Sequence, residues 1–439
     1  MMSLEVEWWA SDEELLLGTV LHDFSDNDFL SILLQRDADS RYRCTGVTGS
    51  YESVSDAREA LFVNVREVIE SGQTTFPQGD ERGKKIDIFQ PIHPADKLNV
   101  AFELVRTLPG YSSARGIIAE AMHHYVDVDG NFIEQFQTTG FDSRLWELYL
   151  FAYLTEERLL IDRSYNAPDF FVSNGECAAA IEAVTVQASQ DGKAEGINPE
   201  ELTPQRIQEL QQHYMPIKFG SPLYSKLKKK YWSKEHVAGR PLVFAIADFH
   251  ASQSMMWSST ALNNYLYGVR HDFEISPSGE LIISPIRIEL HEHNGKRIPS
   301  GFFFTDDAEN VSAVLFSATG TISKFIRMGK VAGFGDPEVK ILFTGMCHKH
   351  DPNAVVPDRF FFEVDEQYIE SWGAGISIFH NPNAKYPLPR EMFPSVAHHY
   401  MRGDGQIISF LPEFYPYAGL TIMMQPTKDG IEESGKDSC

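Results

Sequence analysis

The feature that most limits the fold of this chain is the run PLVFAIA at residues 241–247, in which every side chain is apolar. An uninterrupted apolar run of this length is typical of a fully buried β-strand, because a half-exposed strand alternates apolar and polar residues. The run therefore favours a fold that mixes helices and strands. The chain has 439 residues, 43% of them hydrophobic, so it can bury a large interior, and its length favours two or three domains.

Upstream of this run, helix-like and strand-like segments follow one another in the order α-β-β-β-α-β. Residues 142–155 predict an amphipathic helix with Asp142 or Ser143 at its N-cap. Three predicted strands follow at 159–162, 168–172 and 179–186. Two predicted helices, at 200–213 and 221–234, then lead to the apolar run at 241–247. We therefore expect an α/β (α+β) fold built on an αβββαβ core.

We divide the chain into a small N-terminal α+β module, this core, a C-terminal α+β extension of the sheet and a disordered tail, at residues 1–85, 86–275, 276–425 and 426–439. The N-terminal module shows two strand-like runs around a polar turn, and a helix with a Ser55 cap, at 31–47 and 54–71. The C-terminal extension contains strand-like runs at 282–290, 301–305, 311–316 and 339–344.

Charge, cysteine spacing and hydropathy exclude several classes of protein. The chain carries 62 acidic and 38 basic residues and a net charge of −24, which repels phosphate backbones and excludes a general nucleic-acid coat. Its four cysteines form no CxxC pair, so no zinc knuckle or redox motif is expected. The N-terminal residues are acidic where a secretory signal is basic, and no run of eighteen apolar residues occurs. We expect a cytoplasmic protein that does not enter a membrane.

One basic segment stands out against this negative charge. Residues 218–234, KFGSPLYSKLKKKYWSK, contain six lysines, no acidic residue and interleaved aromatic residues. Lysines can hold phosphates while aromatic rings stack on bases. We therefore predict contacts with nucleic acid from Lys218, Lys228, Lys229, Lys230, Tyr231, Trp232 and Lys234. A solvated helix face explains the segment equally well.

Three carboxylates mark a candidate site in the core. Asp169 follows a proline at the start of a strand, and Glu182 lies in the next strand within AAAIEAVTV. A buried carboxylate needs a partner, a proton or a cation. Adjacent strands would bring Asp169 and Glu182 side by side, and Glu147 would join them from the inner face of its helix. Such a cluster suits a hard divalent cation, Mg²⁺ or Mn²⁺, that activates water for phosphodiester hydrolysis.

Each of these acidic residues also has a structural explanation. Pro-Asp often opens a turn, Glu147 fits an exposed helix face, and Glu182 fits an ion pair with Arg144 or Arg163. The arrangement of the three acids on a helix, a second strand and a third strand favours a catalytic role over these separate explanations.

In this arrangement the chain resembles the PD-(D/E)XK, or restriction-endonuclease-like, nuclease superfamily, and in particular uncharacterised bacterial members. The resemblance rests on Glu147, Pro168-Asp169 and Glu182-Ala183-Val184. It implies a Mg²⁺- or Mn²⁺-dependent endonuclease in which Asp169, Glu182 and the Ala183 carbonyl bind metal and Glu147 completes or tunes the site. It also implies DNA more than RNA as substrate, and a role in defence against phage or foreign DNA. A second copy of the chain or another protein is a further candidate partner.

Val184 departs from the family pattern, since it occupies the position of the family's lysine. We expect Lys226 to replace this lysine, because it flanks the apolar stripe of the helix at 221–234 and its stem can lie along the core. Lys218 and Lys230 are weaker candidates. If no lysine reaches the acids, the domain is a catalytically inactive module that binds nucleic acid or protein.

Histidine pairs suggest a third and weaker interpretation, a His-rich metallohydrolase. They lie at His123-His124, His291 and His293, His348 and His350, and His398-His399. None of these pairs supplies three or four zinc ligands locally, so structural roles are favoured. GxSxG, Walker and complete GxGxxG motifs are missing, which removes the main support for serine hydrolases, nucleotide motors and dinucleotide oxidoreductases.

Overall fold

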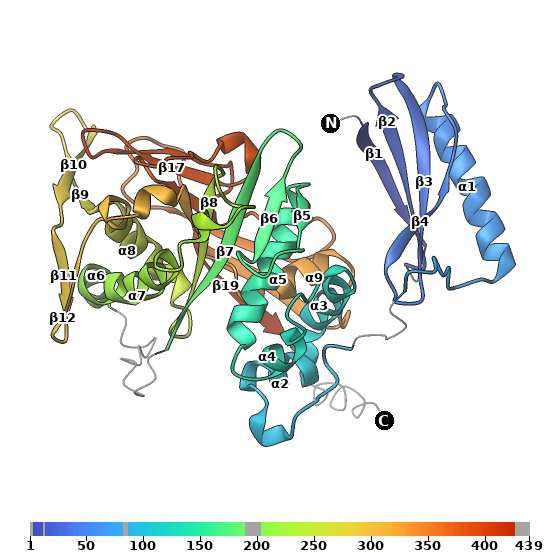
Figure 1. The fold of residues 1–439 in the computed structure, drawn as a ribbon, viewed down its shortest axis with the longest axis horizontal. Helices are drawn as coiled ribbons and strands as arrows, with labels where there is room; N and C mark the ends of the chain where they lie inside the picture. Colours follow the sequence, from blue (N-terminus) through green and yellow to red (C-terminus); the bar gives the residue numbers. More distant parts are fainter. Residues whose placement is uncertain (1–2, 12–13, 82–86, 189–202, 426–439) are drawn as a thin grey trace, which may run out of the picture. The chain divides into compact units, whose positions relative to one another are not determined.

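The computed structural model describes residues 3–11, 14–81, 87–188 and 203–425, and the predicted tail at 426–439 lies outside them. Helices and strands are both abundant, and the largest sheet has parallel and antiparallel neighbours (Figure 1), so the expected mixed α/β class is confirmed. The chain divides into two compact units. Unit 1 contains Met1–Gln90 and Ala119–Tyr125, and unit 2 contains Pro91–Ile118 and Val126–Cys439.

Unit 1 contains an antiparallel sheet with the strand order β1-β2-β3-β4. The strands are Ser3–Ala10, Leu16–Asp23, Asp28–Arg36 and Tyr42–Val47. Helix α1, Val54–Ser71, packs Leu61 and Val65 against the sheet. The two predicted strands and the helix are confirmed. The N-cap is Ser53 rather than Ser55, because the Ser53 side chain accepts a hydrogen bond from the backbone N of Asp56.

Unit 2 is built on an eight-stranded sheet with the order β18-β17-β16-β13-β8-β7-β6-β5. In chain order, β5 to β8 are Leu160–Asp162, Phe170–Ser173, Ala178–Gln187 and Leu242–Phe249. Strands β13, β16, β17 and β18 are Ala313–Ser317, Ile376–His380, Ala397–Met401 and Ile407–Phe410. Strands β5, β6 and β7 are antiparallel neighbours, whereas β8 is parallel to both β7 and β13. Residues from the predicted core and from the predicted C-terminal extension therefore share one sheet.

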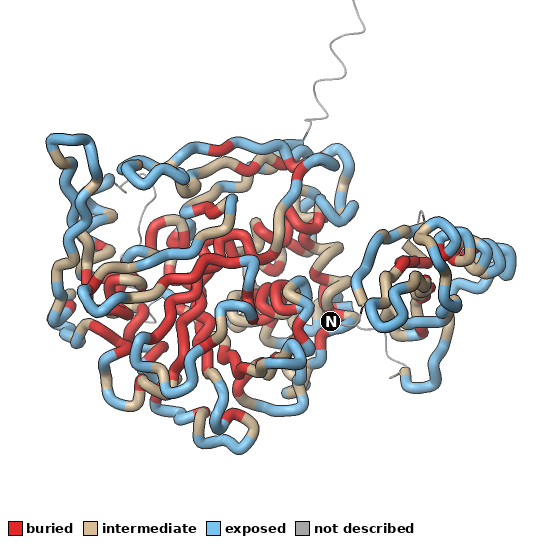
Figure 2. Tube along the Cα trace, turned by 90° about the horizontal axis from the view of Figure 1, so that it is seen from above, coloured by how far each residue is buried: buried red, intermediate tan, exposed pale blue. Residues whose placement is uncertain are grey.

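Strand β8 contains most of the apolar run at residues 241–247. Every residue of Leu242–Ala247 is fully buried, and the buried strands form the middle of unit 2 in Figure 2. Both edges of β8 are paired, with β7 on one side and β13 on the other. The prediction of a fully buried strand is confirmed.

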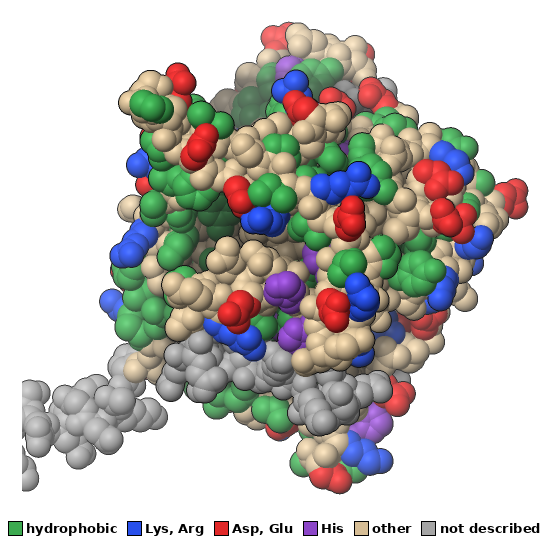
Figure 3. All heavy atoms as spheres, turned by 90° about the vertical axis from the view of Figure 1, so that its left-hand side faces the viewer, with side chains coloured by type: hydrophobic (Ala, Val, Ile, Leu, Met, Phe, Trp, Pro, Cys, Tyr) green, Lys and Arg blue, Asp and Glu red, His purple; other side chains and the backbone are tan. Residues whose placement is uncertain are grey.

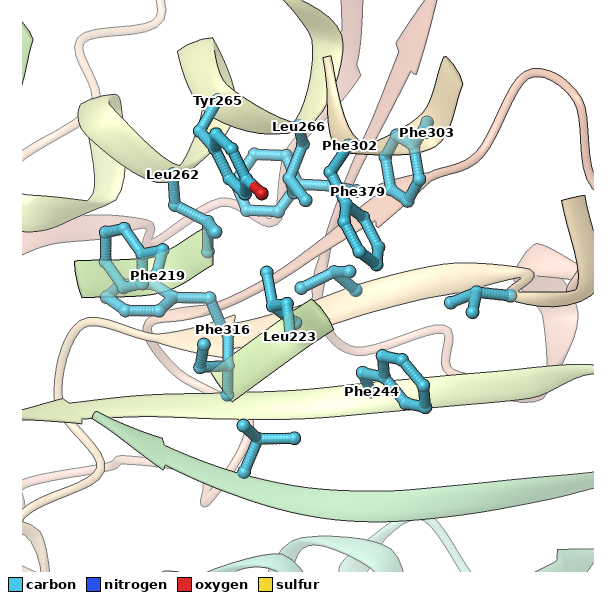
Figure 4. Packing of buried hydrophobic residues seen from close by; sticks show 14 of the residues in the cluster. Phe219, Leu223, Phe244, Leu262, Tyr265, Leu266, Phe302, Phe303, Phe316 and Phe379 are labelled. Atoms are coloured by element: carbon cyan, nitrogen blue, oxygen red, sulfur yellow. The ribbon is translucent and has the colours of Figure 1, made fainter. Parts of the chain in front are cut away.

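Helices cover both faces of the sheet. Val184 and Val186 of β7 face α7 and α8, Met215–Leu227 and Met255–Tyr267, in one hydrophobic cluster (Figure 4). Thr185 lies between these valines and points the opposite way, and its Oγ1 is 3.0 Å from Ser143 Oγ of α5, Phe141–Glu156. The predicted helix cap at Asp142 or Ser143 is wrong, because α5 begins after Gly140 without a side-chain cap.

The segment between β7 and β8 differs in detail from the predicted helices at 200–213 and 221–234. Residues 200–202 lie outside the described part of the chain. A helix α6, Pro204–Glu209, continues through a π-helical turn, Leu210–Tyr214, into α7. Helix α7 ends at Leu227, and Lys230 then adopts a left-handed conformation with φ of 50°. The chain therefore turns inward before Tyr231 instead of continuing as a helix to residue 234.

The other elements surround this sheet. The remaining helices are α2, α3, α4 and α9, Val100–Thr107, Ser112–His124, Phe132–Gln137 and Ile322–Val331. Two hairpins pair β9 with β10 and β11 with β12, at Val269–Ile275, Leu281–Arg287, Leu290–His293 and Lys296–Pro299. A further sheet has the order β15-β14-β19, with strands at Asp358–Glu363, Lys340–Cys347 and Pro416–Met424. The predicted strand at 301–305 is instead a 3-10 turn, Phe302–Phe304. No helix within the described ranges is long and apolar enough to cross a membrane.

Glu370 lies with Lys324 and Arg327 of α9 in a buried ion cluster. The carboxylate of Glu370 is 2.6 Å from Lys324 Nζ and 2.8 Å from Arg327 Nε. Burial opposes ionisation of Glu370, but the two cations outweigh it and lower its pKa to about 2. Burial also lowers the pKa of Lys324 to about 8, against the attraction of Glu370. Each buried charge is compensated by its partners, so removal of Glu370 would leave Lys324 and Arg327 without a counter-charge.

Candidate active site

Asp169 and Glu182 lie opposite each other on neighbouring strands. Phe170 of β6 pairs with Ile181 of β7 in an antiparallel register, which places the preceding Asp169 beside Glu182. Oδ2 of Asp169 accepts a hydrogen bond of 2.7 Å from the backbone N of Ala183. The structure therefore brings together the two acids that the strand pattern predicted to be adjacent.

The carboxylate of Glu182 is buried and receives two donors. Its exposed fraction is 4%, and its Oε1 accepts hydrogen bonds from the Lys226 ammonium and from the Tyr231 hydroxyl, the latter at 2.6 Å. Both donors come from the connection between β7 and β8, one from α7 and the other from the turn after it. Together they compensate a charge that would otherwise be costly to bury.

Lys226 is the lysine that reaches the acidic residues. Of the two weaker candidates, Lys218 donates to the carbonyl of Gln187 at 2.8 Å, and Lys230 pairs with Asp307 at 3.0 Å. Val184, at the position where the resemblance predicts a lysine, is 2% exposed within the hydrophobic cluster under α7 and α8. An ammonium at that position would be surrounded by apolar side chains.

Asp169 lies where a carboxyl group is difficult to ionise. Burial raises its pKa to about 7, and the negative charges of Glu182 and Glu147 act in the same direction. The Ala183 hydrogen bond and the charge of Lys226 oppose this shift without cancelling it. Near neutral pH the carboxyl group therefore holds a proton part of the time. A divalent cation favours the ionised form and relieves this kind of repulsion.

Glu147 has a strong partner of its own. It lies on α5 with 7% of its surface exposed, and Arg144 Nη1 donates to its two oxygens at 2.9 and 3.0 Å. Arg144 is held in place by Gln135 and Asn131, at 2.9 Å each. The arginine that sequence reasoning considered for Glu182 therefore pairs with Glu147, three residues further along the same helix.

The three predicted acids do not converge on one point. A metal site needs at least three ligand atoms close together. Among the described residues, one set of His, Cys, Asp or Glu side chains has its ligand atoms within 4.8 Å of one another, and it consists of Asp37, Asp80 and Glu81 of unit 1. This set excludes Glu147, Asp169 and Glu182. A cation in unit 2 would therefore depend on the adjacent pair Asp169 and Glu182 with the Ala183 carbonyl.

The acidic set of unit 1 is compensated by arginines. Arg41 Nη2 is 2.8 Å from Asp37 Oδ2, and Arg43 Nη1 is 2.9 Å from Asp80 Oδ1. Desolvation of Asp37 is outweighed by the hydrogen bonds and charge of Arg41, so that its pKa is lowered. These ion pairs compensate the charges of Asp37 and Asp80.

The predicted nucleic-acid contacts divide into exposed and buried residues. Lys228, Lys229, Lys230 and Lys234 are exposed. Tyr231 is 2% exposed and Trp232 packs against the hydrophobic cluster. The prediction that Tyr231 stacks on bases is therefore wrong, because the turn at Lys230 directs this side chain inward to Glu182. Tyr224, which is half exposed, offers an accessible ring instead.

Several of the histidines are buried structural groups. His380 Nε2 and His398 Nδ1 are 2.8 Å apart between β16 and β17. Burial lowers the pKa of His380 to about 3 and that of His399 to about 4, so both are neutral at ordinary pH. No histidine in the described part of the chain belongs to a set of three close ligands, which gives the metallohydrolase interpretation no geometric support.

A buried Asp248-His250 pair was missed by sequence reasoning. Asp248 Oδ1 and His250 Nδ1 are 2.6 Å apart at the end of β8, and both residues are at most 2% exposed. The other polar atoms of the two side chains, Oδ2 and Nε2, have no hydrogen-bond partner among the described residues. An Asp-x-His spacing is too short and too common to be recognised as a site in a sequence.

Comparison with known proteins does not assign the chain to a family. No protein-family model, curated protein or solved structure matches it. The function therefore has to be argued from the residues of the site.

Proposed function

We propose that unit 2 is a metal-dependent nuclease of the PD-(D/E)XK type, which hydrolyses phosphodiester bonds of DNA, or of RNA, with Mg²⁺ or Mn²⁺. The observation that carries the proposal is the contact between the Lys226 ammonium and the buried Glu182, beside Asp169 on the neighbouring strand. A role in defence against phage or foreign DNA and a cytoplasmic location belong to the same proposal.

The order and pairing of the elements support this proposal. Helix α5 is followed by the antiparallel strands β5, β6 and β7, and helices α6 and α7 then lead to β8, which is parallel to β7. This is the αβββαβ succession that the resemblance implies. Asp169 and Glu182 occupy the second and third strands of that succession, and Glu147 occupies its first helix.

Asp169, Glu182 and the Ala183 carbonyl fit a hard cation, because all three are oxygen donors and the Asp169 carboxyl group is destabilised by neighbouring negative charge. When bound, a divalent cation activates water and stabilises charge on the phosphodiester oxygens. Hydrogen bonds engage Oδ2 of Asp169 and Oε1 of Glu182. The other oxygen of each carboxylate is the natural ligand.

Lys226 and Tyr231 orient the site. An ammonium has three donors, of which Glu182 takes one, so Lys226 has further protons with which to hold an attacking water or a phosphate oxygen. The Tyr231 hydroxyl holds Glu182 in one orientation. Glu147, already paired with Arg144, contributes its charge to the raised pKa of Asp169 rather than a metal-ligand oxygen.

A catalytically inactive module is the second candidate. The observation that favours it is that Lys226 and Tyr231 already compensate the Glu182 charge, so the metal-free site is stable as a closed ion pair. In that case unit 2 would bind nucleic acid or protein without cutting it.

The test is incubation of purified protein with single- and double-stranded DNA and RNA in Mg²⁺, Mn²⁺ or chelator. Asp169→Ala and Glu182→Ala should abolish metal-dependent cleavage, whereas Glu176→Ala, which removes an exposed carboxylate between the same two strands, should leave it unchanged. Full activity in both site variants would refute the assignment. If nothing is cut but metal raises the melting temperature through Asp169, the inactive module becomes the better account.

A further inference from the structure

A large groove lies between α7 and the β11–β12 hairpin of unit 2. Its volume is about 1600 Å³, and it is lined by the end of β7, by α7, by β12 and by the 3-10 turn at Phe302. This volume exceeds the roughly 300–1,000 Å³ of a typical small-molecule site. Figure 3 shows a hollowed face of the molecule on which basic, acidic and hydrophobic side chains are interspersed. The groove is therefore of a size that suits a polymer.

The charge of the groove is opposite to that of the whole chain. Lys218 and Lys228 line it from α7, Lys296 and Arg297 line it from β12, and Asp306 is the acidic residue in its lining. A positive lining on a protein with a net charge of −24 requires a local reason, and an anionic ligand provides one.

Aromatic and apolar side chains lie between these cations. The ring of Tyr224 is half exposed, with Lys228 Nζ 4.5 Å from its centroid. Ile298 lines the opposite wall, and Tyr265 and Phe302 form a buried floor. Cations beside accessible rings and apolar surface are the combination that binds a phosphate backbone together with the faces of its bases.

The groove lies close to the acidic site, although Asp169, Glu182 and Lys226 are not part of its lining. Thr185 lines it three residues beyond Glu182 on β7, which corresponds to roughly 10 Å along the strand. Ser225 and Lys228 of the lining lie on either side of Lys226 along α7. A strand held in the groove would therefore pass near Asp169 and Glu182.

We propose that this groove binds single-stranded nucleic acid, with the β11–β12 hairpin as the wall that holds the strand against α7. The inference rests on the proposed nuclease function and adds its substrate class. In a duplex the base faces are stacked on one another and cannot contact a protein groove, whereas an unpaired strand offers them to Tyr224 and to the apolar wall at Ile298. Arg297 forms an ion pair with Glu292 at 3.1 Å. Both side chains are exposed, and an exposed ion pair of this kind is weak enough for Arg297 to bind a phosphate instead.

Fluorescence anisotropy of the full chain in chelator, where no cleavage occurs, tests this inference. The probes are a labelled oligonucleotide of about 12 nucleotides, as DNA and as RNA, and the corresponding duplexes. We expect at least one single strand to bind at least about tenfold more tightly than its duplex. The DNA and RNA probes show which polynucleotide the groove prefers.

Three variants assign the binding to the groove. Lys296→Glu with Arg297→Glu should weaken single-strand binding by about tenfold or more and flatten its salt dependence, because two phosphate contacts are lost. Tyr224→Ala should weaken it by about tenfold through the loss of stacking. Lys340→Glu with Lys349→Glu makes the same charge change at exposed lysines outside the groove and should have a much smaller effect. Circular dichroism melts verify that each variant is folded.

Equal binding of single strand and duplex would overturn the inference, as would equal losses in the hairpin variant and its charge control. Groove-dependent binding of single strands without cleavage under any metal would remove the nuclease proposal and leave this inference intact. Cleavage that needs Asp169 but is unaffected by the hairpin and Tyr224 variants would support the nuclease proposal and overturn this inference.

Discussion

The Lys226 ammonium donates a hydrogen bond to Glu182, which lies 44 residues earlier in the chain. The two residues lie on α7 and β7, and α7 belongs to the connection that joins β7 to the parallel strand β8. A connection between parallel strands packs its helix back on the sheet. A lysine on the inner side of that helix can therefore pair with a carboxylate on the strand, which is how Lys226 reaches Glu182.

Replacement of Lys226 should separate rate from metal binding. In the proposed nuclease, Lys226→Met removes a donor near the reacting phosphate, so we expect cleavage to fall by about a hundredfold or more. Mg²⁺ affinity should be kept or increased, because Glu182 loses a competing cation. Lys226→Arg should recover part of the rate. Single-turnover cleavage and calorimetric titration with Mg²⁺ measure the two quantities.

Lys340→Met is the control, since it removes an exposed lysine that lies outside the groove. A normal cleavage rate in Lys226→Met would exclude Lys226 from the chemistry.

Removal of the Tyr231 hydroxyl should destabilise unit 2 more than removal of an exposed one. Tyr231→Phe leaves the ring in place and deletes a hydrogen bond to a buried carboxylate, which should cost about 1.5–3 kcal/mol of the unfolding free energy. Tyr224→Phe makes the same change at a half-exposed ring and should be nearly neutral. Urea denaturation in chelator gives both values, and equal stabilities for the two variants would contradict the role given to Tyr231.

Asp169 should make the metal-free protein less stable as the pH rises. Its pKa is raised from 3.8 to about 7 on folding, so the folded state keeps a proton that the unfolded chain releases. The unfolding free energy therefore falls between about pH 4 and pH 7. Asp169→Asn cannot titrate and should flatten this part of the profile, making the variant the more stable protein in chelator above pH 7.

Denaturation curves across this pH range provide the measurement, with Glu176→Gln as a control at an exposed carboxylate. Identical slopes for the wild type and Asp169→Asn would show that the folded protein does not hold a proton at this residue.

Glu370 should be essential for the stability of unit 2. Glu370→Gln preserves the shape of the side chain but leaves Lys324 and Arg327 buried without a counter-charge, which should cost about 3–5 kcal/mol. Glu366→Gln, at an exposed position four residues earlier, should change the unfolding free energy by less than about 0.5 kcal/mol. Urea denaturation monitored in unit 2 tests the difference, and a small effect of Glu370→Gln would mean that water reaches this cluster.

Much of the fold was predictable because local patterns determine it. The apolar run at 241–247 and the alternation in the preceding strands correctly predict β5 to β8. The end of α7 was not predictable, because Lys230 is a lysine in a left-handed conformation where glycine is expected. The apolar run at 301–305 was interpreted as a strand, but Gly301, with φ of 81°, begins a 3-10 turn that buries Phe302 and Phe303.

The site was predictable only in part. Antiparallel pairing determines that Asp169 lies beside Glu182, and helical spacing places Lys226 near the core. The Arg144-Glu147 pair follows from an i,i+3 spacing that sequence reasoning had available. By contrast, the Tyr231 bond to Glu182 and the contribution of the β11–β12 hairpin to the groove join residues far apart in the chain. No local pattern marks such contacts.

The position of β8 in the middle of the sheet also has a consequence for synthesis of the protein. Its partner β13 follows it by about 70 residues, since Val243 pairs with Ala313, and synthesis proceeds at roughly 5–20 residues per second. For several seconds after β8 leaves the ribosome, one side of a strand whose first six residues are apolar has no strand to pair with. The nascent chain should therefore depend on a chaperone, or on slow translation before β8, to avoid aggregation at this stage.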